Sequence, residues 1–370
     1  MKKLGFIVNP IAGMGGRVGL KGTDGDEILE LAIRLGAKPI APERAKEMLF
    51  ELKKLGFDLE LITYPRVMGE FEARECGFNP VVIGEIGERT SRDDTIRAAR
   101  DMVELGVDLI VFCGGDGTAR DVCEAIDKRV PVLGVPTGVK MHSAVFAVNP
   151  RVAAKIVVDF LKGFLPLRDS EVMDVDEEAF RRGFVSAKLY GYLLVPYEPN
   201  FIQGAKAPSP QTDDERENQL AIARYFVERM DDDTIYILGP GSTIKAVADV
   251  LNIPKTLLGV DIVYRGKLLA SDVNEKKLLD IIKRFDGRCV IVVTPIGNQG
   301  FIFGRGNQQI SPEVIKSIGR DNIVVLATRY KLSTIPCLRV DTGDVEVDDL
   351  LKGYMRVIVD YGEEKIVRVA

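Results

Sequence analysis

Short apolar runs that end in glycine-rich turns and lead into helical patterns are the feature that most constrains this fold. A run of consecutive apolar residues is typical of a strand buried on both faces of a parallel sheet. Strands followed by helices in regular alternation predict a doubly wound α/β layer structure. In the first half the expected strands are 4–8, 59–63, 109–113 and 130–135, and the expected helices are 41–55, 92–105, 118–126 and 152–161.

The pattern changes after residue 165. Antiparallel strands are expected at 172–176, 185–189 and 191–195, followed by a long loop or linker over 196–218. A second α/β stretch is expected over 220–327, and a β-hairpin closes the chain with strands at 355–361 and 365–369. We therefore expect an N-terminal α/β domain over 1–165 and a mixed α/β second domain with antiparallel strands over 166–370.

The composition bounds the function classes. The net charge of −5 gives no overall basic field, so we expect neither a nucleic-acid partner nor a membrane partner. The apolar run behind Lys2 and Lys3 is shorter than the ~7–15 residues of a secretory signal. An odd number of cysteines without a C-x-x-C pair predicts buried, reduced thiols in a cytoplasmic protein. A single histidine supplies few ligands for zinc chemistry and argues against a Ser-His-Asp triad.

The loop after the strand at 109–113 carries the strongest chemical signal. Its residues Gly114, Gly115, Gly117 and Thr118 surround Asp116 and lead into a helix. Glycines let backbone N–H groups approach phosphate oxygens, and the helix N-terminus adds a partial positive charge. Thr118 would cap the helix or donate its hydroxyl to phosphate. We interpret this loop as a nucleotide-phosphate cradle.

Asp116 is unexpected in such a cradle because a carboxylate repels phosphate. It would take the proton of an attacking hydroxyl or help to hold Mg²⁺ between phosphates. In the alternative reading, Gly-Asp-Gly is only a turn in which the aspartate binds its own backbone. The buried strand before it and the helix after it favour a catalytic role for Asp116.

The segment after the next strand opens onto the same sheet edge. It contains Thr137, Lys140 and His142. Lys140 would neutralise phosphate, whereas a solvated surface charge is the alternative. For His142, the only imidazole, the two alternatives are a ligand contact and a hydrogen-bonded structural histidine.

A second glycine-rich loop follows a strand in the second half. The loop contains Gly239, Gly241, Ser242 and Thr243. It follows the first loop by the same number of residues that separates segment 258–260 from segment 133–135. This constant offset indicates a duplicated phosphate-binding unit, although units of this kind also converge. Gly241 occupies the position that matches Asp116, so the second loop would bind phosphate without activating a hydroxyl.

Two loops carry a family resemblance. Phe112 to Thr118 resembles the GGDGT motif of the NAD kinase superfamily, which includes diacylglycerol and sphingosine kinases. The opening loop, with Asn9, Gly13, Gly15 and Gly16, resembles the N-P-x-x-G-x-G loop of that superfamily. The chain looks most like the ATP-NAD kinase-like branch that includes the acetoin-catabolism X proteins.

The resemblance implies that the Gly114–Thr118 loop binds ATP phosphates, with Mg²⁺ as partner of ATP and Asp116 as the activating carboxylate. It implies phosphorylation of the adenosine ribose 2′-hydroxyl of NAD to give NADP, and it suggests a homo-oligomer. Residues 134–143 stand in the place of the usual Asn-Gly segment without matching it, and Asn274-Glu275 is a poor counterpart of the usual Asn-Glu pair. A kinase of another small hydroxyl acceptor and a non-catalytic nucleotide-binding protein therefore remain alternatives.

Overall fold

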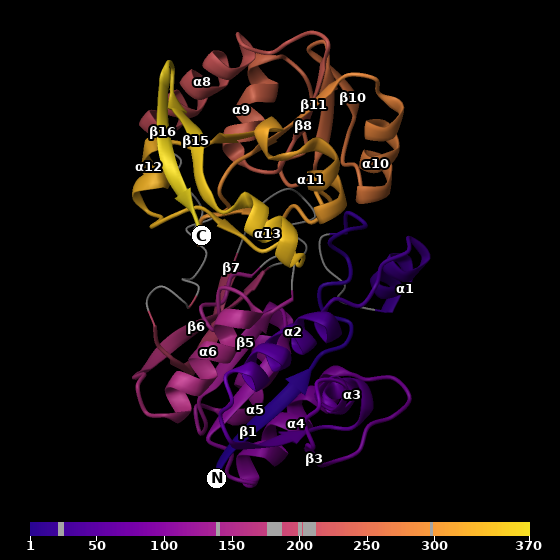
Figure 1. The fold of residues 1–370 in the computed structure, drawn as a ribbon, viewed down its shortest axis with the longest axis vertical. Coiled ribbons are helices and arrows are strands. Elements are labelled where there is room, and N and C mark those ends of the chain that lie inside the picture. Colours follow the sequence, from indigo (N-terminus) through magenta and orange to yellow (C-terminus); the bar gives the residue numbers. More distant parts are fainter. Residues whose placement is uncertain (21–25, 138–140, 176–186, 199–201, 203–211, 297–298) are drawn as a thin grey trace. The chain divides into compact units, whose positions relative to one another are not determined.

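The computed structural model describes the chain except residues 21–25, 138–140, 176–186, 199–201, 203–211 and 297–298 (Figure 1). The chain forms two compact units. The first consists of Met1–Met14 and Gly22–Lys206, and the second of Gly15–Lys21 and Ala207–Ala370. The short segment Gly15–Lys21 thus belongs to the second unit, although it lies near the start of the chain.

The first unit is built on a five-stranded sheet in which every pairing is parallel. Its strand order is β3 (Val81–Val82), β2 (Leu59–Thr63), β1 (Lys2–Val8), β4 (Leu109–Gly114) and β5 (Val132–Pro136). The order reverses between β1 and β4, which defines the topological switch point where open α/β sheets bind ligands. The doubly wound fold expected from the sequence is confirmed.

Helices cover this sheet in pairs. Helix α2 (Ala41–Lys54) packs beside α6 (Pro150–Leu161), and α4 (Arg92–Glu104) packs beside α5 (Asp116–Ile126). Right-handed crossovers on either side of the switch point place α2 and α4 on opposite faces. The remaining helical elements of the described part are α1 (Asp26–Arg34), η1 (Arg66–Met68) and α3 (Glu70–Glu75).

Helix α5 begins two residues before the helix expected at 118–126. Gly115 is its N-cap residue, and Asp116 is its first helical residue. A carboxylate in the first turn is favoured by the partial positive charge of the helix N-terminus. The glycine-rich turn is therefore shorter than the sequence suggested, and Asp116 stands on a regular element.

An antiparallel pair, β6 (Leu167–Val175) and β7 (Ala187–Pro196), completes the first unit. The strands expected at 185–189 and 191–195 are one strand in the structure, and β6 begins earlier than expected. Residues 176, 185 and 186 lie outside the described residues. Val172, Leu193 and Val195 belong to the core of the first unit. Strands β6 and β7 therefore pack in that unit, although the domain boundary expected at 165 lies before both of them.

The expected loop over 196–218 contains the start of a helix. Helix α8 (Asp213–Val227) is capped by Thr212, whose hydroxyl accepts a hydrogen bond from the backbone N–H of Glu215 at 3.3 Å. The Thr-x-x-Glu pattern is a helix-start signal. Most of the rest of that loop lies outside the described residues.

The second unit contains a seven-stranded mixed sheet. Its central strands β8, β11, β13 and β15 are parallel, whereas β10, β9 and β16 pair antiparallel towards its edges. The strand order is β10 (Lys267–Ala270), β9 (Asp261–Tyr264), β8 (Thr234–Leu238), β11 (Arg288–Val293), β13 (Ile323–Leu326), β15 (Gly353–Asp360) and β16 (Glu363–Val369). The mixed α/β second domain and its closing hairpin are confirmed.

Helices and one two-stranded pair make up the rest of the described part of this unit. Its helices are α8, α9 (Ser242–Val250), α10 (Glu275–Arg284), α11 (Pro312–Ile318), η3 (Arg320–Asn322), α12 (Arg329–Ser333) and α13 (Val345–Leu351). Strands β12 (Phe301–Phe303) and β14 (Arg339–Val340) form a separate parallel pair. Apolar residues alternate between the two sheet faces: Ile235 and Ile237 enter one core cluster, and Tyr236 and Leu238 enter another.

The strand that follows α9 contradicts the expected duplication. Strand β9 begins at Asp261 and runs antiparallel to β8, whereas β5 runs parallel to β4. The expected counterpart at 258–260 lies before β9, and the loop there bends back so that the N–H of Gly241 donates to the Leu257 carbonyl at 2.9 Å. The two glycine-rich loops therefore belong to units of different topology.

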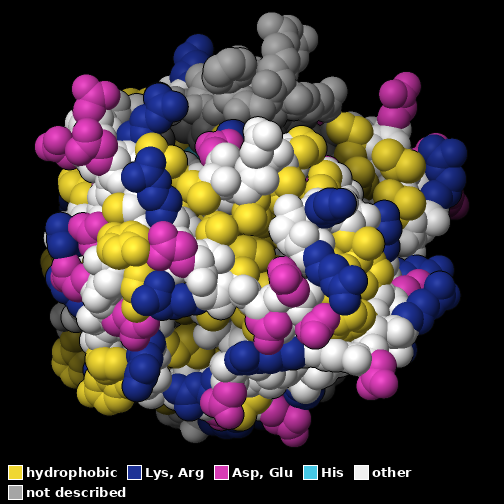
Figure 2. All heavy atoms as spheres, turned by 90° about the horizontal axis from the view of Figure 1, so that it is seen from above, with side chains coloured by type: hydrophobic (Ala, Val, Ile, Leu, Met, Phe, Trp, Pro, Cys, Tyr) yellow, Lys and Arg dark blue, Asp and Glu magenta, His cyan; other side chains and the backbone are white. Residues whose placement is uncertain are grey.

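The surface is mixed in charge. Figure 2 shows basic and acidic side chains interspersed with apolar ones over the face that it presents. All five cysteines lie in described parts of the chain, and none forms a disulfide. Within those parts, the helices are too short or too polar to cross a membrane.

Candidate active site

Asp116 is held by two backbone amides from another segment. Its Oδ2 atom accepts a hydrogen bond from the N–H of His142 at 2.7 Å, and its Oδ1 atom accepts one from the N–H of Ser143 at 3.0 Å. The Nδ1 atom of His142 lies 3.3 Å from Oδ2. Asp116 is 8% exposed and His142 is 1% exposed. The carboxylate therefore has a fixed orientation at the first turn of α5.

The segment that supplies these amides is itself anchored beside β5. The N–H of Gly134 donates to the Val145 carbonyl at 2.9 Å, and the N–H of Ala147 donates to the Gly134 carbonyl at 3.0 Å. A Cβ atom at Gly134 would collide with the Phe146 ring, so only glycine permits this approach. The hydroxyl of Ser143 donates to the Met173 carbonyl at 3.1 Å, which ties the segment to β6.

Asn9 and Thr118 connect the loops that follow β1 and β4. The Asn9 side-chain amide donates to Thr118 Oγ1 at 2.9 Å, and the N–H of Asn9 donates to the Cys113 carbonyl at 3.0 Å. A Cβ atom at Gly114 would lie 2.5 Å from the Thr118 Cβ atom, so the loop requires glycine there. The two resembling motifs therefore meet at the switch point of the sheet. Gly115 and Gly117 remain partly exposed.

Thr137 directly follows β5 at the same edge. Its N–H donates to the Gly114 carbonyl at 3.1 Å. Its hydroxyl is buried and has no hydrogen-bond partner among the described residues. An unsatisfied buried hydroxyl is uncommon in a native structure, so a ligand atom is a natural partner for it. The structure thus brings together Asn9, Asp116, Thr118, Thr137 and His142.

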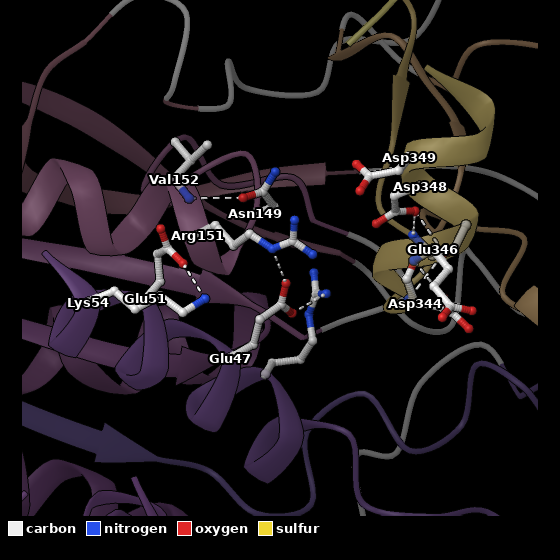
Figure 3. A network of polar contacts seen from close by, with 12 residues as sticks. Glu47, Glu51, Lys54, Asn149, Arg151, Val152, Asp344, Glu346, Asp348 and Asp349 are labelled. Atoms are coloured by element: carbon white, nitrogen blue, oxygen red, sulfur yellow. Dashed lines mark hydrogen bonds and ion pairs between the residues drawn. The ribbon is translucent and has the colours of Figure 1, made fainter. Parts of the chain in front are cut away.

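Two arginines near this edge, Arg44 and Arg151, were not predicted from the sequence. The buried guanidinium of Arg44 donates through Nε to the Pro136 carbonyl at 3.3 Å and contacts Glu47 at 3.2 Å. Glu47 also pairs with Arg151 at 3.1 Å, as Figure 3 shows. Arg44 and Glu47 lie on α2, and Arg151 lies on α6. A proline in the first turn of α2 and another in the first turn of α6 mark the starts of these helices in the sequence. No local sequence pattern shows that Arg44 and Arg151 are neighbours.

Glu72 is a second group that the sequence did not reveal. It lies on α3, is 5% exposed, and its Oε2 atom has no partner within the described residues. Burial raises the pKa of its carboxyl group to about 7. The charge of Glu72 also acts on Cys113, near the end of β4. Burial raises the pKa of the Cys113 thiol, and the charge of Glu72 raises it further.

Comparison with known families decides the relationship. The model of the ATP-NAD kinase N-terminal domain matches residues 4–164, and the model of the ATP-NAD kinase C-terminal domain matches residues 231–369. This chain belongs to the ATP-NAD kinase family. Its two domains support a kinase-type phosphotransferase. No curated protein matched the chain.

Solved structures resemble this ATP-NAD kinase family member only weakly. Two structures of a candidate diacylglycerol kinase from Bacillus anthracis str. Sterne share 18% and 17% identity, with TM-scores of 0.26 and 0.25. The matches cover 47% of this chain and 43% and 46% of those chains, less than half their length. A UDP-GlcNAc 2-epimerase from Neisseria meningitidis, in a UDP-GlcNAc complex, shares 12% identity with a TM-score of 0.24, covering 95% of this chain and 74% of that one.

The site residues divide between the two family domains. All those around Asp116 lie in the ATP-NAD kinase N-terminal domain, together with Gly13, which has a positive φ of 79°. Gly15 and Gly16 lie within residues 4–164 but belong to the second compact unit. Gly239, Gly241, Ser242 and Thr243 lie in the C-terminal domain and second unit. Lys140 lies outside the described residues.

Asn274 has a structural role in this family member. Its side chain accepts a hydrogen bond from the N–H of Lys277 at 3.0 Å and caps α10. Asn274 therefore serves as a helix N-cap. Among the described residues, no group of three or more His, Cys, Asp or Glu side chains is arranged to hold a metal ion. A single carboxylate, Asp116, stands at the phosphate loop.

Proposed function

We propose that this chain transfers the γ-phosphoryl group of ATP to the 2′-hydroxyl of the adenosine ribose of NAD, giving NADP. The observation that carries the proposal is the fixed carboxylate of Asp116, which lies within the Gly114–Thr118 loop at the start of α5. Family membership supports kinase-type chemistry, and the position of this carboxylate supports hydroxyl activation.

In the proposed step, the phosphates of ATP bind to the first-turn N–H groups of α5. These groups have no partner inside a helix and carry its partial positive charge. The hydroxyl of Thr137, which has no partner in the described part of the chain, donates to a phosphate oxygen. Asn9 fixes Thr118 and so holds the two loops in register while the nucleotide is bound.

Asp116 acts on the acceptor. Each carboxylate oxygen has two lone pairs, so each can hold its backbone amide and still accept a second hydrogen. The acceptor hydroxyl gives its proton to Asp116 as its oxygen forms a bond to the γ-phosphorus. The bond between that phosphorus and the β–γ bridging oxygen breaks, and ADP leaves with the electron pair. Positioning and charge neutralisation supply most of the catalysis in such a transfer.

Magnesium would enter this site with the nucleotide. Mg²⁺ is usually held by one or two carboxylates together with substrate phosphates, which fits a loop that carries a single carboxylate. Bound there, it would neutralise charge on the transferring phosphoryl group. The five unpaired cysteines support a cytoplasmic location for the protein.

The test is formation of NADP by the purified full-length protein from ATP, MgCl₂ and NAD, read with an NADP-specific dehydrogenase. Asp116→Asn should lower turnover by about 10²–10⁴-fold, the usual contribution of a general base. It will also weaken one of the two amide hydrogen bonds, so a stability control is needed.

Asp121→Asn is the matched control. Asp121 lies on the same helix, is similarly buried, and pairs with Arg92 at 2.7 Å. Its substitution should reduce stability while turnover stays within about twofold of the wild type. Equal activity of Asp116→Asn and wild type would refute the catalytic role. ATP consumption only with another hydroxyl acceptor would refute NAD, and nucleotide binding without ATP consumption would refute catalysis.

A further inference from the structure

The second unit contains a glycine-rich loop with buried hydroxyls that have no partner within the residues that the structure describes. We propose that the Gly239–Thr243 loop, with Thr294, binds the phosphate group of a phosphorylated small molecule. This site is independent of the catalytic step proposed above, because all of its residues lie in the second compact unit.

The loop follows β8 and leads into α9 at the carboxyl edge of the parallel strands. The N–H of Gly239 donates to the Val292 carbonyl at 2.9 Å, which places the loop beside the end of β11. Gly241 is the N-cap residue of α9 and has a φ of 123°, a conformation that favours glycine. Residue Ser242 is partly exposed, and its hydroxyl accepts from Gln219 at 3.3 Å.

Two threonines supply the independent evidence for a ligand. Thr243 is 1% exposed and Thr294 is 2% exposed, and neither hydroxyl has a hydrogen-bond partner among the described residues. Thr294 directly follows β11 and lies against the loop, since a Cβ atom at Gly241 would be 2.5 Å from its methyl carbon. Burying a hydroxyl without a partner is unfavourable, so both groups are suited to a bound acceptor.

The chemistry of these groups selects the ligand. Helix-terminal N–H groups and two hydroxyls all donate hydrogen bonds, and phosphate oxygens accept them. The loop itself contains no carboxylate. The neighbouring strand β9 carries the carboxylate of Asp261, and this residue lies opposite Leu238 of β8. Its charge is balanced by Lys255 at 3.0 Å, so the edge of the loop is not dominated by negative charge.

Methyl NMR on the full-length protein tests this site. Threonine methyl groups would be labelled with ¹³C, and the signals of Thr243 and Thr294 assigned from the Thr243→Val and Thr294→Val variants. We expect both signals to shift on titration with inorganic phosphate. Each variant should weaken the phosphate affinity read from the remaining signal by about tenfold or more. Unchanged signals at saturating phosphate would refute the proposal.

Thr234→Val is the control variant. Thr234 is 1% exposed and begins β8 at the opposite edge of the sheet, so its substitution should leave phosphate affinity unchanged. ADP and adenosine extend the titration. Tighter binding of ADP than phosphate at these signals would support a nucleotide as the source, whereas equal binding would support a phosphate recognised alone. A shift caused by adenosine alone would contradict phosphate recognition.

Stability provides a second readout. Because both hydroxyls lack partners in the described structure, Thr243→Val and Thr294→Val should not lower the melting temperature without ligand. Phosphate should raise the melting temperature of these variants less than that of the wild type. A clear loss of stability in the absence of phosphate would show that the hydroxyls have structural partners and would count against the proposal.

Discussion

The Oδ2 atom of Asp116 lies 2.7 Å from the backbone nitrogen of His142, and this hydrogen bond joins the start of α5 to the segment after β5. The donor is a main-chain group, so this hydrogen bond does not depend on the identity of residue 142, although the His142 ring also lies against the carboxylate. A carboxylate held in this way keeps one orientation when an acceptor hydroxyl arrives. Such preorganisation is what phosphoryl transfer demands of a protein.

Thr137→Val should separate ligand binding from folding. Its hydroxyl has no partner among the described residues, so its removal should leave the free energy of unfolding unchanged or slightly raised. Affinity for ATP should fall by about tenfold if the hydroxyl donates to a phosphate. Calorimetric titration with ATP and urea unfolding measure the two quantities.

Thr63→Val is the contrasting variant for this test. Thr63 ends β2 and is fully buried, but its hydroxyl donates to the Phe6 carbonyl at 2.9 Å. Its removal should therefore cost about 1–2 kcal/mol of stability. If Thr137→Val destabilised the protein as much as Thr63→Val does, the hydroxyl of Thr137 would have a structural role instead.

Gly114→Ala should disturb the phosphate loop. The new Cβ atom would lie 2.5 Å from the Thr118 Cβ atom, so the first turn of α5 would have to move. Overpacking of this kind costs about 1–3 kcal/mol, and turnover should fall with it. Gly87→Ala is the control, since its nearest atom beyond the chain neighbours is the Arg89 carbonyl oxygen at 3.6 Å. Turnover of Gly114→Ala at the wild-type level would contradict the role given to this loop.

Glu72→Gln should change how stability depends on pH. Burial raises the pKa of Glu72 to about 7, above the ordinary value of 4.5, so the folded state binds its proton more tightly than the unfolded state. The contribution of Glu72 is therefore present below about pH 4.5 and is lost as pH rises towards 7. Relative to the wild type, the variant should gain about 1–3 kcal/mol at pH 8 and almost nothing at pH 4.

Glu70→Gln on the same helix should show the opposite sign. The backbone N–H of Arg66 and the side chain of Arg74 lower the pKa of Glu70, so its contribution is present above pH 4.5 and lost on acidification. Urea unfolding at several pH values measures both differences. A Glu72→Gln difference that did not vary with pH would contradict the raised pKa.

Lys255→Met should strongly destabilise the second unit. Lys255 and Asp261 form an ion pair at 3.0 Å with both side chains 1% exposed. Removal of the lysine leaves a buried carboxylate without its counterion, which costs about 3–5 kcal/mol. Adding Asp261→Asn should recover part of this loss in denaturant unfolding. A loss below about 1 kcal/mol in the single variant would show that water reaches the carboxylate.

The sequence predicted the parts of the fold that depend on local pattern. The apolar run that forms β4 and the glycine-rich turn before α5 were both predicted, as was the position of the segment that begins at Thr137 on the same sheet edge as the Asp116 loop. Strand direction was not readable, because an apolar run is the same in either direction. Segment 258–260 was expected to match 133–135, which forms part of the parallel strand β5, whereas the strand that follows α9 is β9, antiparallel to β8.

Contacts between distant segments were also beyond the local pattern. Arg44 looks like an ordinary polar residue of an amphipathic helix, and only the packed structure brings it to the Pro136 carbonyl. Likewise, no local sequence pattern predicts that the backbone amides of His142 and Ser143 donate hydrogen bonds to Asp116. Such contacts arise from tertiary packing, which a single sequence encodes only indirectly.

The assignment of Gly15–Lys21 to the second unit has a consequence for the order of events during synthesis. The N–H of Glu275 donates to the Arg17 carbonyl at 3.2 Å, so this early segment finds its partner only after most of the chain has left the ribosome. The second unit cannot be obtained by cutting the chain once. A C-terminal fragment would lack residues 15–21. A synthetic peptide of these residues, added separately, would complete the unit in trans.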